Sequence, residues 1–256
     1  MTDVRGRVRN GPVPAIKTLV ERPGLADAPM GADADVPAFV GHDPAGRFIG
    51  YWGIAERFPQ FSVVAVDPDG AVAGKGGGVP FARRGMLPDR GWDELLTWAL
   101  ADVRRGDPPD ALGLLGIAVR PDQRGTGLAA RMLRALKEAA RAAGLAEVVA
   151  PVRPTMKDRE PDVPMREYAR RTRPDGLPAD PWLRTHARAG GTIVAVAPAS
   201  MVVTGSLAEW RAWTGLPFDA DGPVHVPGAL VPVHCHLAHD HAVYVEPNVW
   251  VRHPLP

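Results

Sequence analysis

The sequence predicts an α/β fold in which a mixed central sheet carries helices on both faces. Apolar residues fall on one helical face over 92–103 and again from Leu128 to Ala143, and Ala111 to Val119 between them is apolar on both faces. A second short apolar strand, Glu147 to Val152, follows after Gly144 has ended the second helix. Helix, strand, helix and strand therefore succeed one another, as in proteins whose sheet is covered by helices.

The N-terminal part of the chain supplies further elements of this sheet. Residues 1–35 are rich in Gly, Pro and Asp, and we expect a loosely structured arm with one short strand at Ala15 to Val20. Near-helical spacing of aromatic and apolar residues from Val36 to Pro59 predicts one or two helices. The segment 61–79 predicts a hairpin, because the Asp67-Pro-Asp-Gly70 sequence within it favours a turn.

Composition limits the classes of protein to which the chain can belong. It has 256 residues, 45% hydrophobic and 23% charged, which is ordinary for a globular protein with a sizeable core. The net charge is +1, with arginines scattered among acids, so we expect no nucleic-acid partner. Cys235 stands alone, and no apolar run approaches the about 20 residues that span a bilayer. We expect a soluble, cytoplasmic protein without a membrane partner.

The most informative segment runs from Leu114 to Leu133, LLGIAVRPDQRGTGLAARML. An apolar strand passes through Val119-x-Pro121 into a glycine turn that opens an amphipathic helix. Amides in such a turn and in the first helical turn have no partners of their own, and the helix dipole adds partial positive charge. Gly125 and Gly127 let the main chain approach a ligand closely. The segment therefore predicts a binding site for a phosphate group.

The spacing Arg124-x-x-Gly127-x-Ala129 resembles the (Gln/Arg)-x-x-Gly-x-(Gly/Ala) signature of the GNAT acyl-CoA-dependent N-acyltransferases. In that family the turn holds the pyrophosphate of CoA. The resemblance is firm over Ala111 to Pro154 and fair from Asp180 to Val196. It implies a splayed sheet closed by a C-terminal β-hairpin, with acetyl-CoA or another acyl-CoA as co-substrate.

Two other nucleotide-binding loops are weaker fits. The Walker loop requires Gly-Lys-Ser/Thr, which occurs nowhere in the chain. The stretch Gly125-Thr-Gly127-Leu-Ala-Ala130 also satisfies the dinucleotide fingerprint G-x-G-x-x-A. In a dinucleotide fold, however, the strand runs almost directly into the glycines and an acidic residue ends the next strand. Here five residues intervene and the next strand ends at Arg153, which favours the acyl-CoA loop.

The resemblance also implies which residues hold the cofactor. The pyrophosphate is assigned to the turn, at Arg124, Gly125, Thr126, Gly127, Leu128 and Ala129. The pantetheine arm is assigned to the strand, at Ile117, Ala118 and Val119. Gly116, inside this strand, is expected to mark a bulge or a packing contact. In the family the corresponding strand parts from its neighbour through a bulge, where a backbone N–H polarises the thioester carbonyl.

Proton transfer is the less well defined part of the predicted site. The family often presents a tyrosine as acid on the helix after the second core strand, and His186 occupies that place here, four residues before Gly190. Imidazole titrates near neutrality and could serve as the acid or a relay, although a surface histidine is the alternative. Tyr168 is the fallback donor. The base is unassigned among Glu56, Glu147 and a chain of waters.

The C-terminal hairpin, Ala229 to Leu237 and Ala242 to Val245, is rich in histidine. Its first arm and turn carry His234, Cys235, His236, His239, Asp240 and His241. A divalent metal could use such side chains, but histidines on an exposed hairpin need no metal, and we expect none.

We predict one GNAT-like acyl-CoA-binding domain over 36–256, with insertions near 152–179 and 198–228. The first insertion either lines the acceptor pocket or is an inert surface loop. The implied activity is transfer of an acyl group, most often acetyl, to a primary amine of a small molecule or peptide by direct attack in a ternary complex. A non-catalytic acyl-CoA-binding module and a nicotinamide-dependent oxidoreductase are the alternatives. The oligomeric state is open, with a homodimer as one option.

Overall fold

The computed structural model describes residues 13–28, 36–49 and 51–256. Within these residues a nine-stranded sheet has the order β1-β2-β3-β4-β5-β9-β8-β7, and β6 pairs with β9 beside this path. The strands are β1 (Ala15–Thr18), β2 (Ser62–Val66), β3 (Val72–Phe81), β4 (Ala111–Val119), β5 (Glu147–Val152), β6 (Thr192–Ser206), β7 (Gly222–Val224), β8 (Val233–His236) and β9 (His241–Pro254). The pairs are antiparallel except for the parallel pair β4 and β5, so the sheet is mixed, as predicted.

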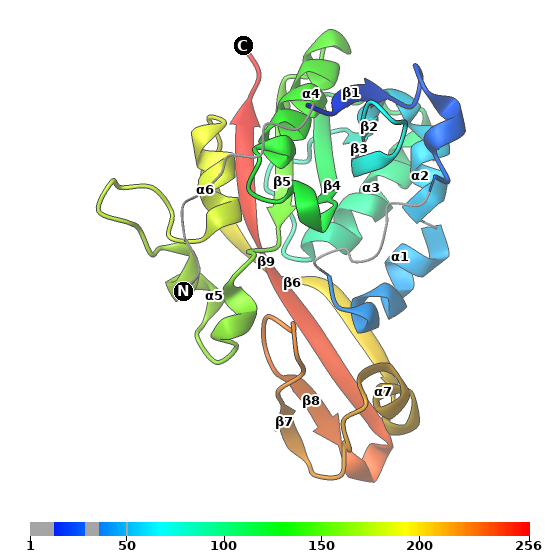
Figure 1. Cartoon of the computed structure of the whole chain (residues 1–256). Helices are drawn as coiled ribbons and strands as arrows, with labels where there is room; N and C mark the ends of the chain where they lie inside the picture. Colours follow the sequence, from blue (N-terminus) through cyan, green and yellow to red (C-terminus); the bar gives the residue numbers. More distant parts are fainter. Residues whose placement is uncertain (1–12, 29–35, 50) are drawn as a thin grey trace.

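Helices cover both faces of this sheet (Figure 1). The α-helices are α1 (Pro44–Ile49), α2 (Tyr51–Arg57), α3 (Gly91–Arg105), α4 (Leu128–Ala142), α5 (Met165–Ala169), α6 (Pro181–Arg188) and α7 (Leu207–Thr214). Short 3-10 helices lie at Pro23–Leu25, Ala38–His42, Pro59–Phe61, Pro121–Gln123, Lys157–Arg159 and Leu237–His239.

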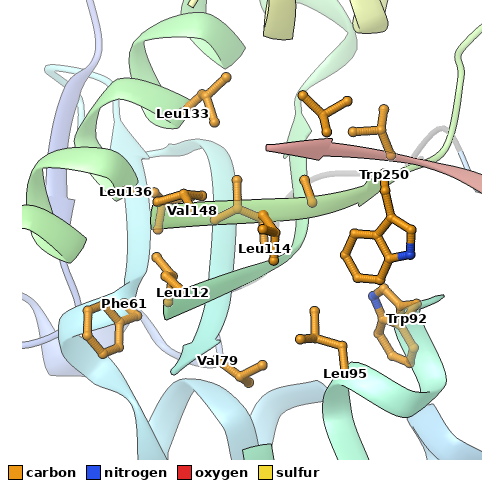
Figure 2. Close-up of a cluster of buried hydrophobic side chains, with 14 of the residues drawn as sticks. Phe61, Val79, Trp92, Leu95, Leu112, Leu114, Leu133, Leu136, Val148 and Trp250 are labelled. Atoms are coloured by element: carbon orange, nitrogen blue, oxygen red, sulfur yellow. The ribbon is translucent and has the colours of Figure 1, made fainter. Parts of the chain in front are cut away.

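Glycines in the strands let the helices come close to the sheet. A Cβ added to Gly113 of β4 would lie 2.4 Å from the Leu95 side chain of α3. On the other face, a Cβ added to Gly74 of β3 would lie 2.9 Å from the sulfur of Met132 in α4. These contacts continue into the main core, in which Leu112, Leu133 and other large side chains are fully buried (Figure 2). The two glycines therefore set how tightly the two layers of helices pack.

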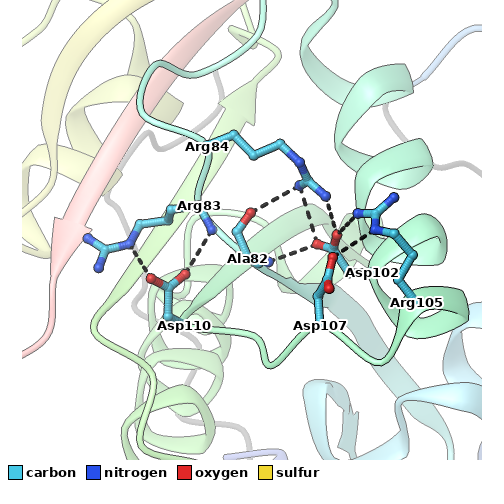
Figure 3. A network of polar contacts seen from close by, with 7 residues as sticks. All are labelled: Ala82, Arg83, Arg84, Asp102, Arg105, Asp107 and Asp110. Carbon is cyan, nitrogen blue, oxygen red and sulfur yellow. Dashed lines mark hydrogen bonds and ion pairs between the residues drawn. The ribbon is translucent and has the colours of Figure 1, made fainter.

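A polar network fixes the connection from β3 into α3 and β4 (Figure 3). The buried carboxylate of Asp102 accepts the backbone N–H of Ala82 at 2.8 Å and pairs with the guanidinium groups of Arg84 and Arg105. Asp110, just before β4, accepts both the backbone N–H and the Nε of Arg83, at 2.9 and 2.8 Å. The carboxylates hold the end of β3 against the end of α3 and the start of β4.

The long strands β6 and β9 extend beyond the main sheet and carry a second core (Figure 1). Trp210 of α7 is fully buried there, with the tilted rings of Phe39 and Phe218 each 5.5 Å away between centroids, and it donates its indole N–H to the carbonyl of Ala242 at 2.8 Å. Strand β8 pairs with the first part of β9, and β7 pairs with β8, which completes this extension. A capping box formed by Ser206 and Glu209 begins α7.

Strand β6 runs without interruption from Thr192 to Ser206, with a register shift between Ala197 and Met201. Pairing with the equally long β9 keeps both halves in one ladder. In the predicted arm, Ala15–Thr18 pairs with β2, whereas residues 1–12 and 29–35 lie outside the described residues.

Candidate active site

The sheet opens between its two parallel strands. Residues 111–113 of β4 pair with 147–149 of β5, and the rest of β5 pairs with β9 instead. Beyond Gly113, β4 has no strand on that side within the described residues, so the two strands diverge toward their C-terminal ends. Burial follows this divergence, because β4 is fully buried through Leu114 and half-buried from Leu115 onward. The expectation of a strand covered on both faces was wrong for this second half.

A bulge in β4 lies at the point where the strands part. Gly77 of β3 pairs with Gly116 and Gly78 pairs with Leu114, so Leu115 is left without a partner residue. The irregularity expected at Gly116 therefore lies at its neighbour. The carbonyl of Leu115 accepts the indole N–H of Trp92 at 2.9 Å, which ties the bulge to the start of α3. Bulges of this kind redirect main-chain groups next to binding sites.

The glycine turn and the start of α4 follow β4 at this open edge. Gly125 and Gly127 have φ values of 76° and 84°, and a Cβ on either would meet nothing within 4 Å. Gly127 is the N-cap of α4, with no side-chain cap. Among the described residues, no acceptor bonds the amides of Gly127, Leu128 or Ala129. A helix N-terminus with unpaired amides, glycines and open space in front of it suits a phosphate group.

Ion pairs hold the turn against the sheet. Arg120 bonds Asp67 at 2.6 Å and Asp122 at 2.7 Å, and its backbone N–H bonds the carbonyl of Ala73 at 2.9 Å. Inside the turn, the hydroxyl of Thr126 donates to the carbonyl of Gln123 at 2.7 Å. The main chain of the turn is thereby fixed while Arg124 is exposed.

Tyr168 lies in α5, within the predicted insertion 152–179. Its ring is 7% exposed and its hydroxyl donates to Asp180 at 3.0 Å. Burial, and then the charge of Asp180, raise the pKa of Tyr168 well above its usual range. Asp180 in turn caps α6 by accepting the amides of Trp182 and Leu183. Tyr168 therefore supports the N-terminal cap of α6, and its hydroxyl stays protonated as a hydrogen-bond donor.

His186 lies at the closed end of the β4–β5 pair. Its side chain is 1% exposed, and its Nδ1 lies 2.9 Å from Nε2 of His253, which pairs with Val148 where β4 and β5 are still joined. Burial, and then His253, lower the pKa of His186 to about 3. The imidazole is therefore a neutral, buried contact between α6 and β9. The structure does not bring His186, Tyr168 and the glycine turn together at the divergence.

The two candidate bases lie on different elements, β5 and α2. Glu147 begins β5 at the closed end, where it forms ion pairs with Arg252 at 3.1 Å and Arg83 at 4.0 Å. Glu56 is an exposed residue of α2. No described contact joins either carboxylate to the bulge, and the base stays unassigned among Glu56, Glu147 and a chain of waters.

A buried polar chain near the bulge was missed in the sequence. The backbone N–H of Trp92 donates to the Ser200 hydroxyl at 2.9 Å, and Ser200 donates to Asn248 at 2.6 Å. Asn248 donates to Glu246 at 3.0 Å, and Glu246 also accepts Arg153 at 3.1 Å. Residues of α3, β6, β9 and the end of β5 are thereby connected. No local pattern signals this chain, because its members are far apart in the sequence.

Asp93 and Asp43 are the second feature that the sequence did not reveal. Asp93 lies in the first turn of α3, where an acid is ordinarily solvated. In the structure Asp93 is 4% exposed and Asp43, which precedes α1, is 2% exposed. One oxygen of each carboxylate, Oδ1, is buried without a hydrogen-bond partner among the described residues. Burial, and then the charge of Asp43, raise the pKa of Asp93 to about 7.

An open groove of about 420 Å³ lies near the start of α3. Met165 and Arg166 of α5 and Val196 and Pro198 of β6 line it, together with Asp89 and Pro247.

The C-terminal hairpin brings histidines together. The ring centroids of His236 and His241 lie 5.1 Å apart. No group of three or more His, Cys, Asp or Glu suited to a metal occurs among the described residues.

Comparison with known proteins identifies the family. The model of the acetyltransferase (GNAT) family matches residues 32–160, half of the chain. The chain belongs to this family. It is also 38% identical over 189 residues to arginine N-acetyltransferase avaD of Aspergillus versicolor, and this alignment covers 66% of the chain and 65% of that enzyme. The chain thus matches somewhat less than two thirds of the relative's length.

Solved GNAT-like structures have the same fold. The loading GNATL domain of CurA from Lyngbya majuscula matches with a TM-score of 0.54 and 17% identity, over 79% of this chain and 80% of that one. GphF GNAT-like decarboxylase, solved in complex with isobutyryl-CoA, matches with a TM-score of 0.54 and 20% identity, over 94% of this chain and 100% of that one. The predicted fold class, a splayed mixed sheet of GNAT type, is confirmed. Among the described residues, no helix is long and apolar enough to cross a membrane.

Proposed function

We propose that this GNAT protein transfers an acyl group, most often acetyl, from acyl-CoA to a primary amine of a small molecule. The observation that carries the proposal is the divergence of β4 from β5 directly beside a glycine turn with unpaired amides. The open edge of β4 can pair with the extended pantetheine arm of CoA, and the glycine turn can hold its diphosphate.

The residues fit this cofactor. The amides of Gly127, Leu128 and Ala129, together with Arg124 and the turn around Gly125 and Thr126, would hold the pyrophosphate. The unpaired edge of β4 at Ile117, Ala118 and Val119 would pair with the amides of the pantetheine arm, as a strand would. The bulge at Leu115 is where we place the thioester.

The reaction needs alignment and the loss of protons. The neutral amine nitrogen attacks the thioester carbonyl carbon, a C–N bond forms, the C–S bond breaks, and the sulfur leaves as thiolate. The nitrogen loses a proton and the thiolate gains one, so the products are an amide and CoA thiol. An amine with a pKa near 10 is neutral only about once in a thousand at pH 7, so deprotonation is the larger demand. Alignment of the two reactants in one complex contributes more than either proton transfer.

The buried side chains of His186 and Tyr168 take no part in the proposed reaction. His186 and Tyr168 are each held by a partner, His253 and Asp180, and we assign them to structure. Water in the open divergence can carry the proton from the amine. The groove beside α5, lined in part by Met165 and Arg166, is the proposed approach for the acceptor. The named activity of the 38% identical relative supports an acceptor like arginine.

Two measurements test the proposal. Acetyl-CoA at 100 times its Kd should stabilise the protein by about 2.7 kcal/mol in a thermal-shift assay, whereas NADPH should not. Release of CoA thiol from acetyl-CoA should then depend on added arginine or another primary amine. Binding of acetyl-CoA without thiol release with any amine would support the non-catalytic alternative. Protection by NADPH alone would refute the assignment of the glycine turn.

A further inference from the structure

The indole of Trp92 bonds the bulge of β4 where the sheet opens. We propose that Trp92 is the residue against which the acyl group of acyl-CoA ends, and that it restricts this group to a short chain such as acetyl. The inference rests on the proposed acyl transfer. It concerns the length of the acyl chain, which neither the glycine turn nor the unpaired edge of β4 determines.

The register with β3 shows which way the bulge carbonyl points. The backbone N–H of Arg120 bonds the carbonyl of Ala73 in β3. The register is unbroken from Val119 back to Gly116, and alternate residues face the same neighbouring strand, so the N–H of Gly116 also faces β3. The carbonyl of Leu115 belongs to the same planar trans peptide group and points the opposite way. It therefore points to the side from which β5 has diverged.

Trp92 closes the open edge of β4 at this carbonyl. Its indole N–H donates to the oxygen of Leu115 at 2.9 Å, on the side where an incoming arm would pair. Ile117 and Val119 alternate with Gly116 and face that open side. An arm that runs from the glycine turn pairs first with Val119 and then with Ile117, and it reaches the indole next. The thioester and its acyl group follow the pantetheine amides, so they come against Trp92.

The ring of Trp92 is held in place by buried contacts. Trp92 is 8% exposed, and its backbone N–H donates to the hydroxyl of Ser200 at 2.9 Å. Ser200 is fully buried and donates to Asn248 at 2.6 Å. A Cβ on Gly91 would overlap Ser200, so the first turn of α3 lies directly on β6. The indole cannot move aside without breaking these contacts, and it therefore sets a fixed limit to the acyl chain.

The first test measures binding by the wild-type protein and needs no turnover. Acetyl-CoA, butyryl-CoA and hexanoyl-CoA are titrated into the protein by calorimetry. We expect acetyl-CoA to bind best and the longer chains to bind about 10- to 200-fold more weakly, which is the range that an extra methylene gives in a pocket of fixed size.

Variants then assign this discrimination to the ring. Trp92→Leu should bind butyryl-CoA more tightly than the wild-type protein does, a gain that a loss of stability cannot produce. Trp92→Phe keeps most of the ring without the N–H donor and should keep the preference for acetyl-CoA. Trp210→Leu is the matched control, because Trp210 is also a buried indole that donates to a backbone carbonyl, that of Ala242, but in the second core. It should bind the three acyl-CoAs in the wild-type order.

Thiol release with arginine as acceptor extends the test to the reaction. The kcat/KM values of the wild-type protein should fall in the same order of chain length, and Trp92→Leu should transfer butyryl faster than the wild-type protein does. If the wild-type protein binds acetyl-CoA but releases no thiol with any amine, acyl transfer fails, and the binding series alone decides the role of Trp92.

The remaining outcomes separate the inference from the proposed function. An unchanged order of affinities in Trp92→Leu would overturn the inference and leave acyl transfer intact. Equal binding of the three acyl-CoAs by the wild-type protein would also overturn it. That result would point to the cavity of about 40 Å³ that Leu115 lines together with Ile54, Gly76 and Gly77. Failure of every acyl-CoA to bind would refute the proposed function, and the inference with it.

Discussion

Replacement of Gly127 by aspartate tests the phosphate site through charge. The side chain would enter the open space in front of α4, where we place the CoA diphosphate. Two unit charges about 5 Å apart repel by about 0.8 kcal/mol at the dielectric constant of water and about 3 kcal/mol at an effective value of 20. The Kd for CoA should therefore rise by about 4- to 200-fold, with the site's exposure favouring the lower half of this range.

The matched variant is Gly127→Asn. Asparagine and aspartate both tolerate the positive φ of 84° better than other side chains, so the two variants carry the same backbone strain, about 1 kcal/mol, and differ in charge. Isothermal calorimetry with CoA at 0.05 and 0.5 M salt should show a difference between them that shrinks as salt screens the charges. Gly144→Asp, at a φ of 75° beyond the far end of α4, should leave CoA binding unchanged. Equal affinities of Gly127→Asp and Gly127→Asn would place the diphosphate elsewhere.

Two further predictions concern the packing and titration of the core. Gly113→Ala should lower the free energy of unfolding by about 1–3 kcal/mol, because its Cβ would lie 2.4 Å from Leu95. The double variant with Leu95→Ala should lose less stability in a denaturation assay than the sum of the two single losses, because the clash is then absent; additive losses would contradict the clash. Burial lowers the pKa of His186 to about 3 and that of His253 to about 4, below the unfolded value near 6.5. The unfolded chain therefore binds more protons than the folded chain between pH 6.5 and 4. As the pH is lowered through this range, the free energy of unfolding should decrease by up to about 1.4 kcal/mol per pH unit for each imidazole. His186→Phe should flatten this slope in urea titrations at pH 7.5, 6 and 5, and an unchanged slope would contradict the buried neutral pair.

Local patterns predicted the elements around the cofactor turn closely. The strand expected at 111–119 is β4, the strand expected at 147–152 is β5, and the helix that follows the turn ends at Ala142, one residue before the expected end. These features depend on neighbours within a few residues, such as a glycine at positive φ or an acid at a helix start, and such interactions are written in the local sequence.

Side chains from distant segments were not predicted, and the reason is the same for each. His186 matched the place of a family acid along the chain, but β9 returns beside α6 and covers it with His253. Asp93 had the spacing of a solvated first-turn acid, but β6 and the start of α1 bury it. Glu246 pairs with Arg153, which is 93 positions away in the sequence.

The sequence by itself determined that a strand, a glycine turn and a helix follow one another with open amides at the helix start, because a residue's φ preference and the unpaired amides of a helix start are local properties. The tertiary structure alone decided where β4 leaves β5, which acids are buried together, and which titratable groups stay neutral. The burial of a group and its interaction with other charges depend on the segments that pack around it, and these segments are strands and helices that are far apart in the sequence.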